Sequence, residues 1–190
     1  MANTYTSLYY HFTFSTKNRE LWISQEIESR VWEYVGGIAR KHGMTAVQIG
    51  GIEDHIHALV LSLPTIAPSQ IAQYLKGGSS KWIHEEFPRL RGFEWQDGYG
   101  AFTVGKSSVP DVIEYIRNQR EHHRKKTFQE EYLELLKKHD VDYDKRYVWG
   151  MIQSSLRDPV AISTCAPDLK GRPKLMRRSG RVDPALKALV

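Results

Sequence analysis

Two histidines stand two residues apart in the segment GGIEDHIHALVLS, residues 50–62. The segment is otherwise apolar, as a buried strand would be, and successive side chains of a strand point to opposite faces. His55 and His57 therefore share a face, about 7 Å apart at the backbone, with Ile56 on the other face. Two imidazoles at this spacing can converge on one metal ion, but two ligands do not complete a site. Taken alone, such a pair is more often explained by ordinary hydrogen-bonded histidines at a half-exposed sheet edge.

A second group of reactive side chains lies in the segment EYIRNQREHHRK, residues 114–125. On a helix, Tyr115, Gln119 and His123 are four residues apart and form one polar stripe, while neighbouring isoleucines and valines face another side. A tyrosine hydroxyl is a nucleophile once something activates it, and an amide oxygen or an imidazole can bind a metal ion. Taken alone, the tyrosine would be a packing residue and the glutamine a solvated helix former.

The elements that must position these residues follow from hydrophobic periodicity and turn residues. The second of two adjacent strands, expected to be antiparallel, carries the histidine pair, and the most strongly patterned helix carries the tyrosine. Gly43 ends the first helix, and the Asp97-Gly98 turn marks either a hairpin or a strand entered from a loop. The order is βαββαβαα, which predicts an α+β fold with an antiparallel sheet covered by helices. The predicted strands span residues 5–16, 44–51 and 52–63, and the predicted helices span 25–43, 68–87, 108–126 and 127–140.

Basic charge is concentrated at the end of the chain. Residues 151–190 hold eight Lys or Arg against three acids, whereas the first 150 residues hold 19 of each. We expect one domain over residues 1–150 and a basic, extended or disordered tail over 151–190. Such a tail suits a polyanionic partner, although a solvated extension has the same composition. A single cysteine, the lack of a signal segment and the lack of a membrane span predict a cytoplasmic protein.

The combination of motifs resembles a known family. The strand of His55, Ile56 and His57, followed by a helical Tyr115 and Gln119, is similar to the single-tyrosine histidine-hydrophobe-histidine (HUH) transposases of the insertion-sequence 200/605 group, including REP-associated tyrosine transposases. The likeness extends over about residues 5–148 through YYHFTFSTKNR, EDHIHALV, LKGGSSKWI, WQDGYGAFTV and VIEYIRNQREHHR.

The resemblance implies a fold, an activity and an ion. The fold would be a ferredoxin-like antiparallel sheet, usually paired as a homodimer, with the HUH motif on a central strand and the nucleophile on a C-terminal helix. Tyr115 would attack a phosphodiester of single-stranded DNA and form a 5′-phosphotyrosine. His55, His57 and Gln119 would bind Mg²⁺ or Mn²⁺, with His123 as an alternative third ligand. Related relaxases often carry two tyrosines four residues apart, but here only Tyr115 is available.

Basic residues near the motifs are candidates for phosphate contacts, because Lys and Arg supply most such contacts to nucleic acid. The expected partner is single-stranded DNA, with hairpins at the ends of the element implied by the resemblance. Two alternatives are a domesticated relative that acts on dispersed repeats with the same chemistry, and a noncatalytic nucleic-acid-binding module with structural histidines. The candidate DNA contacts are Lys17, Arg19, Lys76, Lys81, Arg117, Arg120 and Arg124.

Removing residues 151–190 is expected to weaken DNA binding and to flatten its dependence on salt, because phosphate contacts release counterions. The measurement is the affinity for single-stranded DNA of the full and shortened chains at several salt concentrations. An unchanged salt dependence would exclude a role of this segment in phosphate binding.

Overall fold

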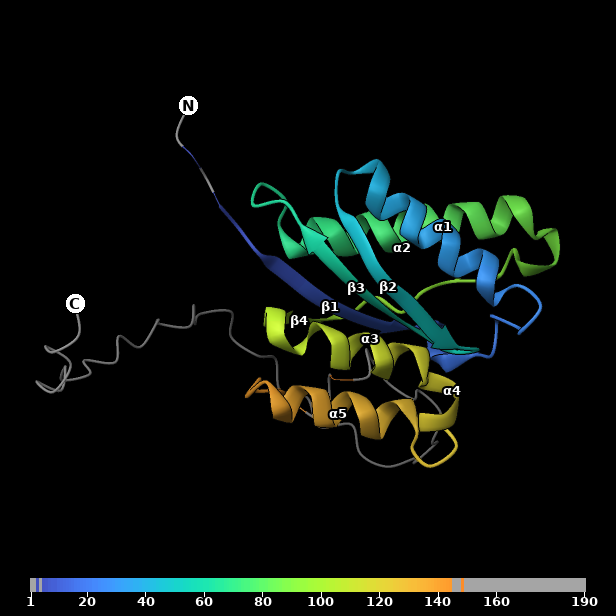
Figure 1. Cartoon of the computed structure of the whole chain (residues 1–190). Coiled ribbons are helices and arrows are strands. Elements are labelled where there is room, and N and C mark those ends of the chain that lie inside the picture. Colours follow the sequence, from blue (N-terminus) through green and yellow to red (C-terminus); the bar gives the residue numbers. More distant parts are fainter. Residues whose placement is uncertain (1–2, 4, 145–147, 149–190) are drawn as a thin grey trace, which may run out of the picture. The chain divides into compact units, whose positions relative to one another are not determined.

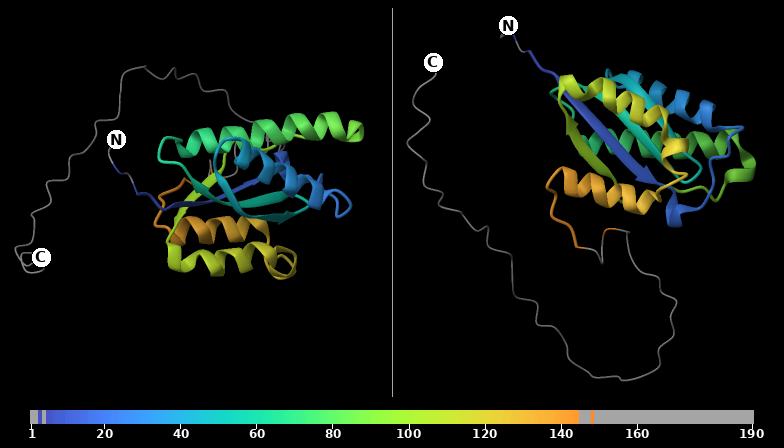
Figure 2. Two further views of the ribbon diagram at one scale, coloured as in Figure 1. Left: turned by 45° about the horizontal axis from the view of Figure 1, so that its top comes forward. Right: turned by 60° about the horizontal axis from the view of Figure 1, so that its bottom comes forward.

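The computed structural model describes residues 3, 5–144 and 148. A four-stranded antiparallel sheet forms its middle layer, with helices on both faces (Figures 1 and 2). Its order is β2-β3-β1-β4, so the strand of the histidine pair, β3, is central. The ferredoxin-like prediction is therefore confirmed. The strands are β1 (Leu8–Ser15), β2 (Thr45–Ile52), β3 (His55–Ser62) and β4 (Gly100–Val104).

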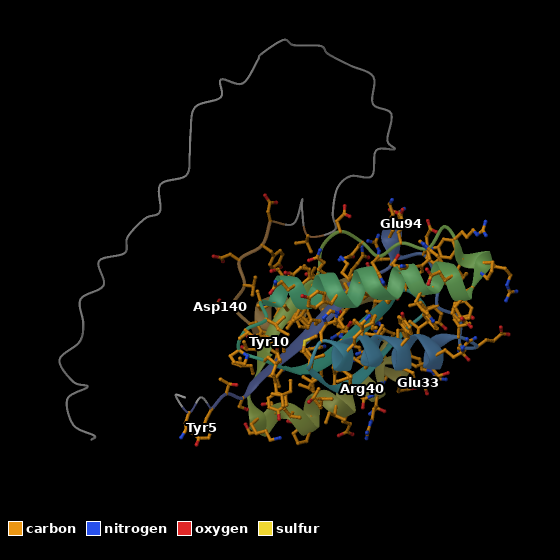
Figure 3. All side chains as sticks on the ribbon, turned by 90° about the horizontal axis from the view of Figure 1, so that it is seen from above. Tyr5, Tyr10, Glu33, Arg40, Glu94 and Asp140 are labelled. Carbon is orange, nitrogen blue, oxygen red and sulfur yellow. The ribbon has the colours of Figure 1, made fainter. Side chains whose placement is uncertain are left out.

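Helices α1 (Glu28–Lys41) and α2 (Pro68–Glu86) cover one face of the sheet. Their apolar sides meet the inward side chains of the central strands in the main core, which includes Phe12, Phe14 and Ile56. Charged residues of α1 such as Glu33 and Arg40 lie on the outer surface of this layer (Figure 3). As predicted, α1 stops at Gly43, whose φ of 75° is a left-handed conformation that glycine adopts without steric cost.

Helices α3 (Val109–Arg117), α4 (Gln119–His122) and α5 (Phe128–Lys138) lie on the opposite face of the sheet (Figure 2). Thr127 begins α5 with a reciprocal capping box to Glu130, which satisfies free backbone donors at that end. Within the described part of the chain, no helix combines the length and the apolar character needed to cross a membrane. The described residues also form three short 3₁₀ helices: η1 (Lys17–Arg19), η2 (Pro88–Leu90) and η3 (Lys106–Ser108).

One element differs from the sequence prediction, and the structure decides one alternative that the sequence left open. The helix predicted over residues 108–126 is broken at Asn118, whose backbone (φ −94°, ψ 17°) separates α3 from α4. Asparagine competes for backbone hydrogen bonds and so favours helix ends. At the second site, Asp97-Gly98 does not form a hairpin of two regular strands. The alternative, a strand entered from a loop, is the one observed, with β4 preceded by an isolated bridge between Thr16 and Trp95.

Gly50 lets α3 lie close to β2. A Cβ atom at Gly50 would stand 2.8 Å from the backbone oxygen of Ile116, the residue next to Tyr115. We expect Gly50→Ala to lower the free energy of unfolding by about 1–3 kcal/mol, because α3 must move. The control is Gly77→Ala in α2, where no atom lies within 4 Å of the added carbon. There the substitution should be neutral or stabilising by about 0.5–1 kcal/mol.

Urea unfolding of the two variants and the wild type measures both effects. Equal stability of Gly50→Ala and the wild type would show that the contact between α3 and β2 is not as tight as the structure indicates.

Candidate active site

The histidine pair is buried between the sheet and the helices α3, α4 and α5. The side chains of His55 and His57 have no exposed surface, and Ile56 points to the other core, as the alternation of a strand requires. In the sheet, His57 pairs with Gly50 of β2 and Thr13 of β1, and His55 pairs with Ile52 and Ser15 of the same two strands. The half-exposed sheet edge considered as an alternative is therefore wrong.

Hydrogen bonds to backbone or acidic groups orient two of the imidazoles. His55 Nδ1 lies 2.7 Å from Asp54 Oδ1, and His123 Nδ1 lies 2.7 Å from the carbonyl oxygen of Lys126. Carboxylate and carbonyl oxygens only accept, so each Nδ1 carries the proton and donates it. In the neutral imidazole the lone pair is then on Nε2. Both Nε2 atoms point inward, toward Gln119.

Gln119 brings an oxygen between these two imidazoles. Its amide nitrogen donates to Glu131 Oε1 at 3.1 Å, which leaves Oε1 of the amide 3.1 Å from His55 Nε2 and 3.0 Å from His123 Nε2. The side chain is only 1% exposed. Three atoms with lone pairs thus face one another, an arrangement that is favourable when a cation or an added proton lies among them.

Glu131 was not among the predicted site residues. It lies on α5 and is 2% exposed, with Oε2 3.3 Å from Nε2 of both His57 and His123 and 3.9 Å from His55 Nε2. Burial alone would raise the pKa of Glu131, but the surrounding histidines, His57 first, hold it far below its usual range. The sequence contains a signal for it: Glu131 is three residues after Phe128 and four before Leu135, so it interrupts the apolar stripe of the helix.

Four of these residues could hold a metal ion together. One ligand atom from each of His55, His57, His123 and Glu131 lies within 4.8 Å of all the others. His57 Nδ1 is 2.9 Å from His11 Nε2, whereas His57 Nε2 and Glu131 Oε2 are buried without a hydrogen-bond partner in the described structure. Buried polar atoms left unpaired are costly, and a divalent ion would satisfy both. The donor set therefore fits a divalent metal.

Tyr115 reaches the same point from α3. Its ring centroid lies 5.6 Å from that of His57 and 6.0 Å from that of His11, and its hydroxyl donates a hydrogen bond to Glu131. Burial, followed by the negative charge of Glu131, raises the pKa of the phenol above its usual value. The structure thus brings Tyr115, His55, His57 and Gln119 together, although a helix break separates Tyr115 from Gln119.

A cavity of about 560 Å³ opens beside the tyrosine. Helix α3 contributes Asp111, Val112 and Tyr115 to its wall, β1 contributes His11, and the end of α5 contributes Lys138. The hydroxyl of Tyr115 is therefore reached through a hollow of mixed apolar and charged character rather than being sealed in the core.

Three of the seven predicted DNA contacts bind other parts of the chain that are distant in sequence. Lys76 Nζ donates to the carbonyl oxygens of residues 96, 97 and 98, and burial lowers its pKa. Arg120 forms ion pairs with Glu28 at 2.7 Å and with Glu53 at 2.8 Å. These pairs connect α4 with the start of α1 and with the turn between β2 and β3. Arg117 donates to the side chain of Gln48 at 3.2 Å.

The other four predicted contacts are spread over the surface. Lys17 pairs with Glu94, Lys81 with Glu85, and Arg124 with Glu121, all with side chains that are more than half exposed. Exposed pairs of this kind contribute little to stability and exchange partners readily. Arg19 is in η1. The DNA-binding role of all seven stays a prediction.

Comparisons with known proteins identify the family. Residues 4–119 match the family model described as "Transposase IS200 like". The chain is 31% identical over 131 residues to the transposase for insertion sequence element IS200 of Salmonella typhimurium, covering 64% of this chain and 82% of that protein. It is 24% identical over 119 residues to the ISDra2 transposase TnpA of Deinococcus radiodurans, covering 60% and 85%.

A solved structure agrees with these matches. A crystal structure from Deinococcus radiodurans R1, determined as that of a candidate transposase, superposes with a TM-score of 0.52 at 25% identity, covering 63% of this chain and 96% of that one. The sheet with its buried histidine pair and the sequence matches together define a transposase, a protein of DNA transposition. The chain belongs to the IS200-like transposase family.

The raised pKa of Tyr115 predicts that the phenol stays protonated beyond pH 10, where a tyrosine in a peptide is half ionised. Because the folded pKa exceeds the unfolded one, the contribution of this group to stability is complete below about pH 10 and declines above it. The measurement is the ¹³Cζ resonance of labelled tyrosine, with Tyr115 assigned by its loss in Tyr115→Phe. Half-titration of this resonance below pH 10 would contradict the burial seen here.

Proposed function

We propose that this transposase cuts and rejoins single-stranded DNA through a covalent bond to Tyr115, with a divalent ion held by His55, His57 and Gln119. One observation carries the proposal: the hydroxyl of Tyr115 and the inward-facing atoms of the histidines meet at a single buried point. A phosphodiester at that point would lie next to both a nucleophile and a Lewis acid. The cavity beside Tyr115 supplies a path for the strand.

The reaction exchanges one phosphodiester for another. The Tyr115 oxygen forms a bond to phosphorus and gives up its proton, the bond from phosphorus to the 3′ oxygen breaks, and that oxygen takes up a proton to become a 3′-hydroxyl. The other product is a 5′-phosphotyrosine. Because this linkage keeps the energy of the phosphodiester, a 3′-hydroxyl of DNA can attack it later and rejoin strands without ATP.

The raised pKa of Tyr115 makes assistance necessary, since a protonated phenol is a weak nucleophile. An ion at the site would polarise the phosphate and offset the negative charge of the transition state. What the chain itself does is to hold the tyrosine ring against His57 and His11 and to fix the hydroxyl on Glu131. Such fixed geometry lowers the entropic cost of the attack.

Mg²⁺ or Mn²⁺ is the ion we propose. Two imidazoles and an amide oxygen suit Mn²⁺ well and Mg²⁺ less well, and they leave coordination positions for water and phosphate. His123 has its Nε2 on the same side of Gln119 as His55 does and is a candidate for a further ligand. A closed structural zinc site would be built from cysteines and histidines, and Cys165 is the single cysteine of the chain.

The partners and the place of action follow from this chemistry. We propose that the DNA ends of the element, with their hairpins, are the substrate, that the basic residues around the site and in residues 151–190 contact phosphates, and that residues 1–150 form the catalytic domain. The chain would act as a homodimer on cytoplasmic DNA. A domesticated relative would use the same site on dispersed repeats.

The test of the proposed function uses labelled single-stranded hairpin DNA from the ends of the element, incubated with the full chain and Mn²⁺. A covalent protein–DNA adduct is expected on a denaturing gel. Tyr115→Phe and EDTA should each abolish it, because one removes the nucleophile and the other the ion. The matched control is Tyr34→Phe in α1, a tyrosine stacked on Trp82 in the other layer, which should keep the adduct.

An adduct that persists in Tyr115→Phe would contradict the role of Tyr115. DNA binding with no adduct in any variant would favour the noncatalytic binding module.

A further inference from the structure

We propose that Glu131 is the anionic ligand of the divalent ion, so that binding of the ion fastens α5 to the sheet. The inference deepens the proposed function and rests on it, because it concerns the same metal centre. Its starting point is a carboxylate that is 2% exposed and lies on a helix otherwise docked by apolar side chains.

The burial of Glu131 needs an electrostatic explanation. Phe128 and Leu136 of the same helix face are buried against Phe102 of β4, and the ring of Phe128 also stacks on His55 with centroids 4.6 Å apart. An apolar side chain at position 131 would suit this face. A buried charge is costly unless other groups pair with it. The groups around this carboxylate are imidazoles, which are the usual partners of a carboxylate in a metal site.

The two oxygens of Glu131 have different partners. Oε1 accepts from the Tyr115 hydroxyl and from the Gln119 amide at 3.1 Å, and His122 Nε2 lies 3.4 Å away. Oε2 has no hydrogen-bond partner among the described residues, although it lies 3.3 Å from His57 Nε2 and His123 Nε2. One oxygen therefore satisfies neutral donors, and the other is free to coordinate.

Two of the imidazoles around Oε2, those of His55 and His123, direct Nε2 toward it and carry their proton on Nδ1. Asp54 and the Lys126 carbonyl hold the protons of His55 and His123 on their outer nitrogens. In the neutral state, the Nε2 atoms of His55 and His123 are then acceptors, as Oε2 is, and acceptors this close repel one another. A divalent ion among them turns the repulsion into coordination. Its ligand atoms would come from β3 of the sheet and from α5 of the helical layer at once.

The charge of the centre supports the same assignment. Imidazoles and the Gln119 amide are neutral, so they leave a divalent ion with its full double charge in a buried place. Glu131 reduces this charge to +1, and one phosphodiester of DNA would bring it to zero, the state with the lowest desolvation cost. Because the second oxygen of Glu131 binds the Tyr115 hydroxyl, the ligand also positions the nucleophile.

Metal binding without DNA tests the proposal. The full chain is titrated with Mn²⁺, and the six-line EPR signal of free Mn²⁺ is recorded for the wild type and for Glu131→Gln. We expect Glu131→Gln to weaken Mn²⁺ binding by at least the ten- to hundredfold that loss of an outer-shell partner costs. The matched control is Glu134→Gln, which removes the same charge from the same helix at a 62% exposed side chain paired with Lys126. It should bind Mn²⁺ as the wild type does.

A second measurement requires no substitution at Glu131. Hydrogen exchange of the wild-type backbone with and without Mn²⁺ should show slower exchange in α5 when the ion is bound, and no change in α1, which lies in the other layer. Equal exchange in α5 under both conditions would overturn the proposal, as would wild-type or tighter Mn²⁺ binding by Glu131→Gln.

His57→Ala separates this inference from the proposed function. If His57→Ala loses Mn²⁺ binding and Glu131→Gln keeps it, the metal centre stands and the role of Glu131 is excluded. If His57→Ala also binds Mn²⁺ as the wild type does, the metal centre itself is excluded, and the inference falls with it.

Discussion

The structure depends on one electrostatic constraint: several lone pairs converge on a point between β3 and the helices α3, α4 and α5. His55, His123 and Gln119 direct acceptor atoms to that point, and the charge of Glu131 lies against them. Such a cluster is unfavourable in itself, and a positive charge makes it favourable. The hydrogen bonds to Asp54 and to the Lys126 carbonyl prevent the rings from turning their protons inward. The same positive charge would therefore stabilise this region and take part in its chemistry.

The ferredoxin-like scaffold meets this constraint by keeping its two tasks on different faces of one sheet. Ile56 and the phenylalanines of β1 pack against α1 and α2 in an apolar core. The alternate positions of the same strands, which point to the other face, are occupied by the histidines. The close approach of α3 to Gly50 then brings Tyr115 within reach of His57. Backbone geometry, rather than side-chain flexibility, sets the distance between Tyr115 and the histidines.

Much of this arrangement could be predicted from the sequence, because it follows from local patterns. Strand alternation placed His55 and His57 on one face, helical spacing placed Tyr115 near Gln119, and the order of elements gave the sheet. Glu131 could not be assigned in this way, since its role depends on how α5 folds back over β3, which no local pattern specifies. The partners of the basic residues were missed for the same reason: Lys76 meets carbonyls twenty residues away in the chain, and the ion pairs of Arg120 span more than sixty. The interruption at Asn118 was missed because the four-residue spacing of Tyr115, Gln119 and His123 continues across it.

The elements around the site have a consequence for stoichiometry. The histidines come from β3, the tyrosine from α3, the amide from α4 and the carboxylate from α5, all of one polypeptide. Within the described residues, a single molecule therefore already contains every side chain of the proposed site. Dilution to single molecules would leave each such set intact.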